Sequence, residues 1–299
     1  MPSIRARFWK MLIRRMFQEQ MSIEEYRALI VTNSRFPSPM PKGVDVERFD
    51  VNGLDAAWIS PIDADAGKVI LHFHGGGYVI GGIKAHLMMC ISMAKSLNIK
   101  MLLPDYRVAP EHPFPAALED GLKIYGWLLE QGYKAGDIIF SGDSAGGGLA
   151  LAATLSLRDK AEPLPAAVIC ISPWVDLTLS GKSHITNADS DVVLRTDDLR
   201  EWASAYTGES NWKNPLVSPL YADFHGFPPL FIQVNDDEIL LDDARRLAEK
   251  AQADGVDVTL KIWKGLWHVW HAVGNMIPES KKTYEEIGQF VRANLHKDK

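Results

Sequence analysis

Residues 138–148 read Ile-Ile-Phe-Ser-Gly-Asp-Ser-Ala-Gly-Gly-Gly. The apolar residues 138–140 predict a short buried strand, and the small residues 147–153 predict the first turns of a helix. Between them, residues 142–146 follow the pattern Gly-x-Ser-x-Gly, in which a sharp turn from strand to helix raises a serine hydroxyl above the edge of a sheet. The flanking glycines leave room for the strand and the helix to pass closely. The stretch therefore predicts Ser144 as a nucleophile.

Strands and helices alternate on both sides of this unit. Apolar or alternating runs predict strands at 44–49, 56–59, 68–73, 100–103, 138–140, 166–171, 230–234 and 256–262. Helices are expected at 83–96 and 120–131, and the Asn52-Gly53 pair predicts a hairpin turn between the first two strands. This order is typical of an α/β fold whose mostly parallel sheet carries helices on both faces and has an antiparallel edge.

The first twenty residues have a different pattern. Apolar residues recur at helical spacing among five basic residues, and Ser22-Ile-Glu-Glu25 predicts a capping box at the start of a second helix. We expect the first helix to pack its apolar side on the body of the protein, although a basic amphipathic helix also suits an anionic membrane surface.

A long insertion follows Ser172. More than fifty residues, up to Pro228, contain a predicted helix at 196–206 but none of the predicted strands. Because ligands bind at the carboxyl ends of the strands in open α/β sheets, we expect the insertion and the N-terminal helices to form a helical cap there. The expected division is 1–45 and 181–215 for the cap, and 46–180 with 216–299 for the catalytic domain.

Composition limits the classes of function. The chain has 299 residues and a net charge of −6, which argues against nucleic acid as a partner. Cys90 and Cys170 lie in apolar runs and form neither a metal pattern nor a disulfide framework, which favours a reducing, cytoplasmic location. No apolar run reaches 18 residues, and Arg14 and Arg15 interrupt the N-terminal candidate for a signal peptide. No stable membrane anchor is therefore expected.

Hydrolysis through a serine also needs a base, an acid that orients the base, and donors for the tetrahedral oxyanion. Residues 74–77, His-Gly-Gly-Gly, directly follow a predicted strand. Glycines without β-carbons let successive N–H groups point into one small space. We expect the N–H groups of Gly76, Gly77 and Ala145 to form the oxyanion hole, and the chemistry requires no metal or organic cofactor.

Among nine histidines, His268 is the expected base. It follows the last predicted strand within Gly265-Leu-Trp-His-Val-Trp, and the order serine, acid, histidine is the one that accompanies this kind of nucleophile turn. His271 is the competing candidate, but it lies farther from the strand end and suits the next helix. His72 and His112 are expected to be structural.

The residues alone leave the acid open. Asn235-Asp236-Asp237-Glu238 follows the strand predicted at 230–234, and several of its carboxylates are within reach of a base after the last strand. Asp242 and Asp243 suit the start of the next helix, where negative charge is favourable.

Four stretches together resemble the hormone-sensitive-lipase-like esterases, the bacterial branch of the α/β hydrolases with H-G-G-G and G-D-S-A-G motifs. They are residues 74–78, 105–117 (Asp-Tyr-Arg-Val-Ala-Pro-Glu-His-Pro-Phe-Pro-Ala-Ala), 142–147 and 265–270. The resemblance implies an α/β-hydrolase fold with a helical cap. It also implies a lipase-like carboxylic-ester hydrolase for short- to medium-chain acyl esters, with Ser144 as nucleophile and His268 as base.

The resemblance bears on the acid as well. The family usually has Asp-Pro-Leu-x-Asp at this place, and Glu238-Ile-Leu-Leu-Asp242 matches it in register. The match assigns Glu238 as the acid, because glutamate is permitted in such triads, and Asp237 is the alternative. The implied triad is Ser144, His268 and Glu238.

Other functions and partners stay open at this point. A non-catalytic small-molecule receptor on the same fold would be expected to lack the base, and an amidase could use the same triad. The expected partner is a small-molecule ester, and a homodimer is permitted if the strand at 256–262 lies at the sheet edge. Four aromatic residues are expected either to wall an acyl pocket or to form the core of the cap: Tyr78, Trp202, Tyr206 and Trp212.

Overall fold

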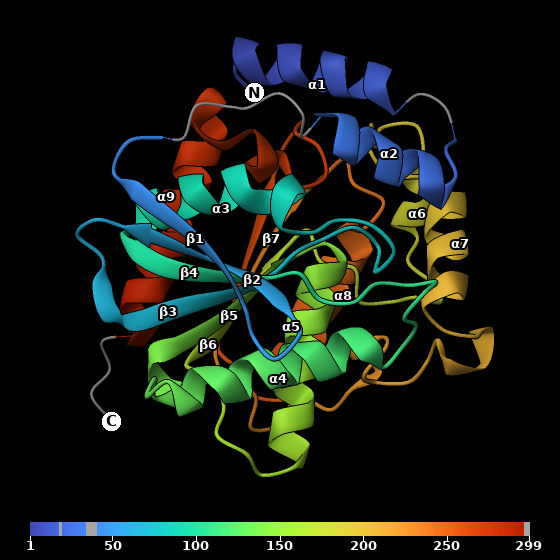
Figure 1. Ribbon diagram of the computed structural model, residues 1–299. Helices are drawn as coiled ribbons and strands as arrows, with labels where there is room; N and C mark the ends of the chain where they lie inside the picture. Colours follow the sequence, from blue (N-terminus) through green and yellow to red (C-terminus); the bar gives the residue numbers. More distant parts are fainter. Residues whose placement is uncertain (18–19, 34–40, 296–299) are drawn as a thin grey trace.

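The computed structural model describes residues 1–17, 20–33 and 41–295. At its centre lies one eight-stranded sheet with the order β1-β2-β4-β3-β5-β6-β7-β8 (Figure 1). The strands are β1 Val44–Asp50, β2 Asp55–Pro61, β3 Asp65–Phe73, β4 Ile99–Pro104, β5 Ile138–Asp143, β6 Ala167–Ile171, β7 Leu230–Asn235 and β8 Val258–Trp263. β2 runs antiparallel to its neighbours β1 and β4, and the strands from β3 to β8 are parallel to one another. The predicted hairpin and the mostly parallel sheet are confirmed.

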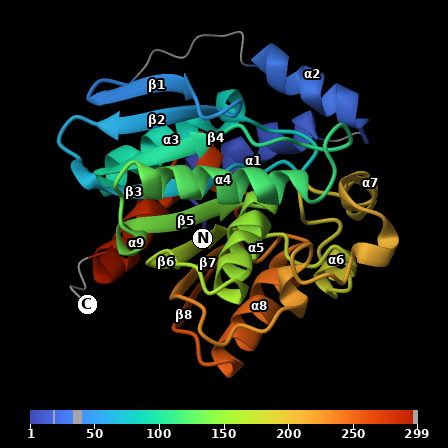
Figure 2. The ribbon, with the colours of Figure 1, turned by 60° about the horizontal axis from the view of Figure 1, so that its bottom comes forward.

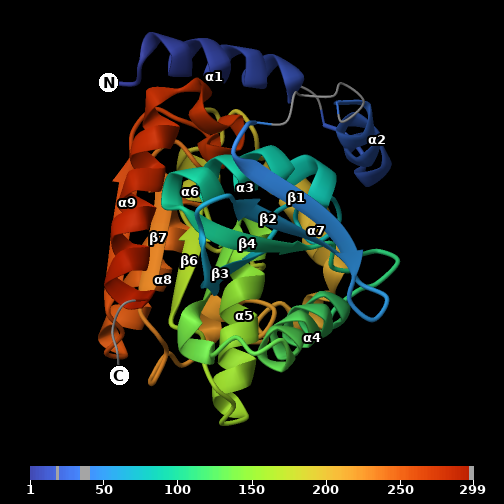
Figure 3. The ribbon, with the colours of Figure 1, turned by 60° about the vertical axis from the view of Figure 1, so that its left-hand side comes forward.

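Helices cover both faces of the sheet (Figures 2 and 3). One face carries α3 (Ile83–Leu97) and α9 (Pro278–Leu295), and the other carries α4 (Ala116–Glu130), α5 (Ala145–Asp159) and α8 (Leu241–Ala253). Successive side chains of a strand point to opposite faces, so each strand supplies both cores. Ile70 and Ile139 belong to the core under α3 and α9, whereas Leu71 and Phe140 belong to the core on the α5 side.

Four more helices belong to the N-terminal segment and the insertion. They are α1 (Ile4–Met16), α2 (Ile23–Asn33), α6 (Ser183–Thr186) and α7 (Thr196–Tyr206). The predicted capping box is present, because Ser22 Oγ accepts from the N–H of Glu25 and the Glu25 carboxylate accepts from the N–H of Ser22. The Tyr26 hydroxyl donates to Asp198 Oδ2 at 3.0 Å, which ties α2 to α7. Within the described ranges, no helix is both long and apolar enough to span a bilayer.

The structure departs from the sequence-based prediction mainly at the ends of elements. α4 begins at Ala116 instead of residue 120, and β8 begins at Val258 instead of residue 256. The short α6 was not predicted, because four residues are too few to show a helical period. The described residues also form four 3-10 segments: η1 Ala135–Asp137, η2 Glu209–Asn211, η3 Pro219–Tyr221 and η4 Trp270–Met276.

The parallel strands gather the predicted site residues at one edge of the sheet. The loop with His74 follows β3, Ser144 follows β5, Glu238 follows β7 and His268 follows β8. Because these strands are parallel, their carboxyl ends meet at the same edge, where open α/β sheets bind ligands. Among the described strands, β8 pairs with β7 alone and lies at the end of the sheet.

Candidate active site

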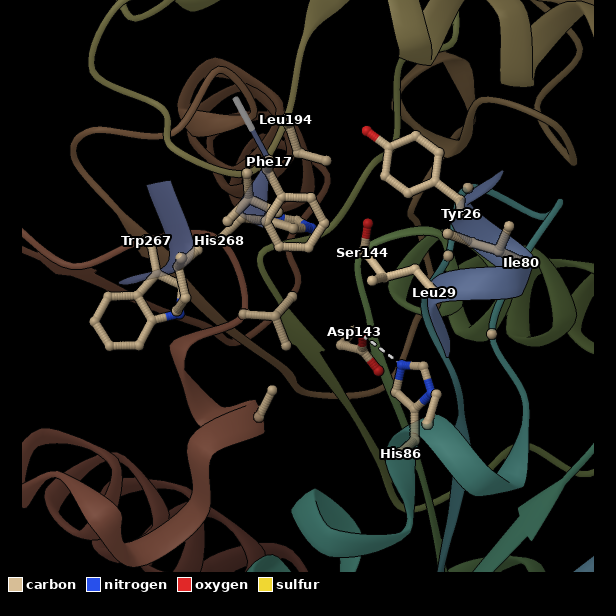
Figure 4. A pocket seen from close by; sticks show the side chains of 18 of the residues that line it. Phe17, Tyr26, Leu29, Ile80, His86, Asp143, Ser144, Leu194, Trp267 and His268 are labelled. Carbon is tan, nitrogen blue, oxygen red and sulfur yellow. Dashed lines mark ion pairs between the residues drawn. The ribbon is translucent and has the colours of Figure 1, made fainter. Parts of the chain in front are cut away.

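Ser144 lies at the turn between β5 and α5. Its backbone is left-handed, with φ 53° and ψ −122°, a conformation that residues other than glycine seldom adopt. A β-carbon at Gly142 would overlap the carbonyl group of Gly146, and one at Gly146 would overlap the carbonyl oxygen of Phe73. Both glycines are therefore required for the strand and the helix to pass this closely. The turn leaves the Ser144 side chain facing a cavity (Figure 4).

The side chain of Asp143 connects this turn to the loop after β3 through a hydrogen bond. Its Oδ1 accepts a hydrogen bond from the N–H of Gly75 at 3.1 Å and lies 3.1 Å from Nε2 of His72. Its Oδ2 lies 3.4 Å from Nε2 of His86, the ion pair drawn in Figure 4. Burial raises the pKa of Asp143, but the charge of His86 and the hydrogen bonds from both histidines outweigh burial and hold this pKa well below its usual range.

Two of the three residues expected to form the oxyanion hole lie in the loop after β3, and the third begins α5. Gly76 and Gly77 have φ angles of 117° and 60°, which glycine adopts without strain. Ala145 is the first residue of α5, where backbone N–H groups lack partners inside the helix. In the part of the chain that the structure describes, the N–H groups of Gly76, Gly77 and Ala145 have no hydrogen-bond acceptor. A β-carbon at Gly77 would overlap the ring of Trp202, so the loop packs directly against α7.

His268 and Glu238 form a buried pair. Nδ1 of His268 lies 2.7 Å from Oε2 of Glu238. The second carboxylate oxygen of Glu238 accepts hydrogen bonds at 2.8 Å from Ser172 Oγ and from the N–H of Asn235, which fixes its orientation. Burial lowers the pKa of His268, but the hydrogen bond to Glu238 and the nearby carboxylates outweigh burial, and the pKa lies above its ordinary value.

The other carboxylates near this pair have different partners. Asp237 forms an ion pair with Lys10 of α1 at 2.5 Å. Asp242 and Asp243 accept hydrogen bonds from backbone N–H groups of the insertion that follows β6. Among the described carboxylates, Glu238 is the one hydrogen-bonded to the imidazole of His268.

The other histidines considered as bases lie in different surroundings. His271 lies in η4, and its Nε2 is 3.0 Å from Oε1 of Gln233. Burial lowers the pKa of His271 to about 3, so this imidazole is neutral near pH 7. His72 is buried in β3 beside Ser141 and Asp143, and His112 is exposed in the loop before α4.

Ser144 and His268 line the same cavity, which has a volume of about 720 Å³. A largely apolar part of its lining comes from the N-terminal segment and the insertion: Trp9, Ile13, Met16, Phe17, Tyr26, Leu29, Val193, Leu194 and Trp202. Figure 4 shows Phe17, Tyr26 and Leu194 around the space in front of the Ser144 hydroxyl. Such a cavity suits a small molecule with an apolar part.

The four aromatic residues whose role was open divide between the two alternatives. Trp202 lines the cavity. Tyr78 and Tyr206 are buried and stack with ring centroids 3.9 Å apart, and Trp212 packs against the large core that includes α5. One of the four therefore walls the cavity, Tyr78 and Tyr206 are core residues, and Trp212 is partly buried against the core.

Several known proteins are similar to this chain in sequence and in fold. The sequence profile of a family described as the α/β-hydrolase fold matches residues 70–272. An acetyl-hydrolase from Streptomyces hygroscopicus is 43% identical over 242 residues, which are 81% of each chain. An esterase from the bacterial hormone-sensitive lipase family has a crystal structure that superposes with a TM-score of 0.93, at 41% identity and 99% coverage of both chains.

The chain belongs to this α/β-hydrolase family. A further relative of the hydrolase is an esterase from Acinetobacter venetianus, 38% identical over 228 residues that cover 76% of this chain and 75% of the relative. The resemblance to hormone-sensitive-lipase-like esterases, inferred from four motifs, is confirmed, and so is the class of carboxylic-ester hydrolase.

Some residues of this hydrolase site were not predicted from the sequence. His86 joins the site through Asp143, and Ser172 orients Glu238, although neither residue belongs to a recognisable catalytic pattern. Phe17, directly after α1, and Tyr26 in α2 also reach the cavity, and the sequence pattern singled out neither residue. Periodicity identifies a buried face but not the surface that it covers.

One group of side chains among the described residues has the composition of a metal site. Ligand atoms of Asp223, His225 and Asp254 lie within 4.8 Å of one another. The group is mostly exposed, and Asp223 and His225 already hydrogen-bond to each other at 2.6 Å. None of these residues lines the cavity with Ser144.

Proposed function

We propose that this hydrolase is a serine carboxylesterase that cleaves short- to medium-chain acyl esters through Ser144, His268 and Glu238. The observation that carries the proposal is the 2.7 Å contact between His268 and Glu238 beside the cavity that both His268 and Ser144 line. The apolar wall of this cavity supports an acyl group as the recognised part of the substrate. A relative of known structure, EstE5, was soaked with p-nitrophenyl butyrate; it is 40% identical over 98% of this chain, with a TM-score of 0.92.

In the proposed mechanism, His268 takes the proton of Ser144 while Oγ attacks the ester carbonyl carbon. Glu238 bonds to Nδ1 of His268, which leaves Nε2 for the serine and stabilises the imidazolium that forms. His268 then gives the proton to the leaving alcohol, and an acyl-enzyme remains on Ser144. A water molecule, activated by the same imidazole, attacks the acyl carbonyl and releases the acid and the free serine.

The negative oxygen of each tetrahedral intermediate would bind to the N–H groups of Gly76, Gly77 and Ala145. Their lack of other acceptors among the described residues supports this role, since a preorganised donor is free to bind the developing charge. Removal of one such donor typically lowers the rate by on the order of 10²–10³.

The division into a cap and a catalytic domain is part of the proposal. Residues 1–45 and 181–215 form the cap, and residues 46–180 and 216–299 form the catalytic domain. The support is that the apolar cavity wall comes from α1, α2, α7 and the segment before α7.

The compartment and the oligomeric state are also proposals. Cys90 and Cys170 are buried free thiols, which supports a reducing compartment such as the cytoplasm. A homodimer through β8 is supported by its position at the sheet edge.

The direct test is hydrolysis of p-nitrophenyl esters from acetate to palmitate by the wild type, Ser144→Ala and Glu238→Gln. We expect cleavage of the short and medium esters, a loss of roughly 10⁶ in kcat for Ser144→Ala, and a loss of about 10⁴ for Glu238→Gln. If Glu238→Gln keeps wild-type activity while Ser144→Ala is inactive, another carboxylate is the acid. If the wild type binds esters without turnover, the protein is a receptor and the proposal fails.

A further inference from the structure

The outer side of α1 is apolar although the helix already has a buried side. Ile4, Phe8 and Met11 follow one another at spacings of four and three residues, which places them on one face of a helix. Their side chains are 77%, 54% and 46% exposed. Figures 1 and 3 show α1 at the outside of the molecule, with this helix forming its uppermost part in both views.

The opposite side of α1 fixes the helix on the body of the protein. Ala6 and Ile13 are 1% and 9% exposed. The N–H and the hydroxyl of Ser3 both donate to the carboxylate of Glu279, and Lys10 pairs with Asp237. The outward direction of the apolar face is therefore set by contacts along the whole helix.

Basic residues surround this outer apolar face. Residues 1–17 contain five arginines and lysines and no acidic residue, in a chain whose net charge is −6. Arg5, Arg7 and Arg15 are exposed, and within the described ranges none of them forms an ion pair with a carboxylate. Arg5 and Arg7 lie on the two flanks of the apolar stripe, and Arg15 lies beyond its C-terminal end.

We propose that the outer face of α1, formed by Ile4, Phe8 and Met11 with Arg5, Arg7 and Arg15, binds an anionic lipid surface. An amphipathic helix lying in such an interface inserts its apolar stripe at the level of the headgroups. The arginine stems extend along the stripe and place their guanidinium groups at the lipid phosphates. The binding is peripheral and reversible, because the helix lies on the surface and does not cross it.

The charge and the apolar centre of the face together favour an anionic lipid surface over a second copy of the chain or a nucleic acid. A second copy of the chain docking through the same face would bring two basic helices together, which is unfavourable. A nucleic acid would satisfy the arginines but would leave the apolar stripe in water. An anionic bilayer matches both the charge and the apolar centre of the face.

The bound orientation would have a consequence for substrate access. The same helix contributes Trp9, Ile13 and Met16 to the wall of the cavity that contains Ser144. Docking of its outer face therefore places the cavity wall next to the lipid, so that esters dissolved in the surface lie close to the site. The binding itself does not depend on catalysis and can be tested in a protein without the nucleophile.

The test is co-sedimentation of the full-length Ser144→Ala protein with vesicles of phosphatidylcholine, with and without phosphatidylglycerol. We expect binding to the vesicles with phosphatidylglycerol, weakened by salt, and little binding to phosphatidylcholine alone. Replacing Arg5, Arg7 and Arg15 together by glutamine should lower the affinity roughly a hundredfold, at about fivefold for each charge. Phe8→Ser should lower it by about tenfold or more, because the ring leaves the interface.

Matched substitutions elsewhere serve as controls. Ile62→Ser and Ile185→Ser remove apolar side chains that are 76% and 84% exposed, and Lys160→Gln with Lys213→Gln removes exposed positive charges outside α1. These variants should bind like the parent, and circular dichroism should show that every variant is folded. Equal binding to both kinds of vesicle, or full binding by Phe8→Ser, would overturn the proposal. So would a dimer in sedimentation velocity that Phe8→Ser abolishes, or a nucleic acid bound more tightly than the vesicles.

Discussion

The ammonium group of Lys10 lies 2.5 Å from the carboxylate of Asp237, the residue directly before Glu238. A helix at the start of the chain is thereby joined to the loop that holds the imidazole of His268. The contact also gives Asp237 a partner outside the proposed triad, although both side chains are partly exposed and such pairs contribute only about 0–1 kcal/mol to stability.

Asp237→Asn is expected to show whether Asp237 anchors α1 through Lys10 or serves as the acid that orients His268. The substitution removes the ion pair but leaves the contact between Glu238 and His268, so kcat should change by no more than a few-fold. KM should rise, because α1 carries part of the cavity wall and loses an anchor. Lys10→Met should have the same effect on KM, and the double variant should add nothing further. Steady-state kinetics on p-nitrophenyl butyrate would measure both quantities, and a large fall in kcat for Asp237→Asn would make this residue the acid.

The pH dependence of kcat/KM should follow the charge of His268. The imidazole must be neutral to accept the serine proton, so activity should fall as the pH drops through its pKa. This pKa lies above the ordinary 6.5 because the hydrogen bond and charge of Glu238 outweigh burial. In Glu238→Gln the supporting charge is lost, so the acid limb should move to lower pH while the rate itself decreases. An acid limb that stays in place in Glu238→Gln would show that another group sets it.

Asp143→Ala should destabilise the fold strongly. The substitution removes the buried carboxylate that His72, His86 and the N–H of Gly75 share, and breaking a buried ion pair costs about 3–5 kcal/mol. Because the pKa of Asp143 is depressed, its contribution is fully present at neutral pH and is lost as the pH falls through the folded-state pKa. Urea unfolding at neutral and acid pH would measure this, and the variant should lose less stability on acidification than the wild type. A free energy of unfolding equal to that of the wild type at neutral pH would contradict the prediction.

Gly77→Ala should lower kcat by on the order of 10²–10³ through displacement of one proposed oxyanion donor. The new methyl group would overlap the ring of Trp202 in α7, and alanine disfavours the φ of 60°. Combining it with Trp202→Ala removes the overlap but not the backbone strain, so part of the activity should return. Gly126→Ala is the matched control, because a β-carbon there meets no atom within 4 Å. If the double variant is no more active than Gly77→Ala alone, the steric explanation is wrong.

Local patterns account for most of the fold. The strand–turn–helix unit around Ser144, the hairpin and the capping box at Ser22 were predictable because each depends on residues next to one another in the chain. The assignment of Glu238 needed the register of a known family, since the adjacent Asp237 has the same chemistry. In the structure Asp237 pairs with Lys10, more than two hundred residues away, and no local pattern encodes such a contact.

The cavity wall was not predictable for the same reason. The aromatic residues Tyr78 and Tyr206 had the composition of a ligand pocket, yet they stack on each other inside the protein. Tyr26, which does reach the cavity, lies in α2, and Phe17, which also reaches it, directly follows α1. The period of such helices indicates only that one side is buried. Which surface a helix covers is decided by packing between distant segments.

The stack of Tyr78 on Tyr206 has a consequence for engineering and for divergence in the family. Tyr78 directly follows the glycines at 75–77, and Tyr206 ends α7, so the stacked rings join the loop after β3 to the insertion. Gly77 belongs to the same contact between the loop and α7, since the ring of Trp202 occupies the place where a β-carbon at residue 77 would lie. A chimera that takes α7 from a relative would therefore need the loop at 76–78 from the same relative. The two segments form one exchangeable module, and they are expected to have changed together as substrate preference diverged.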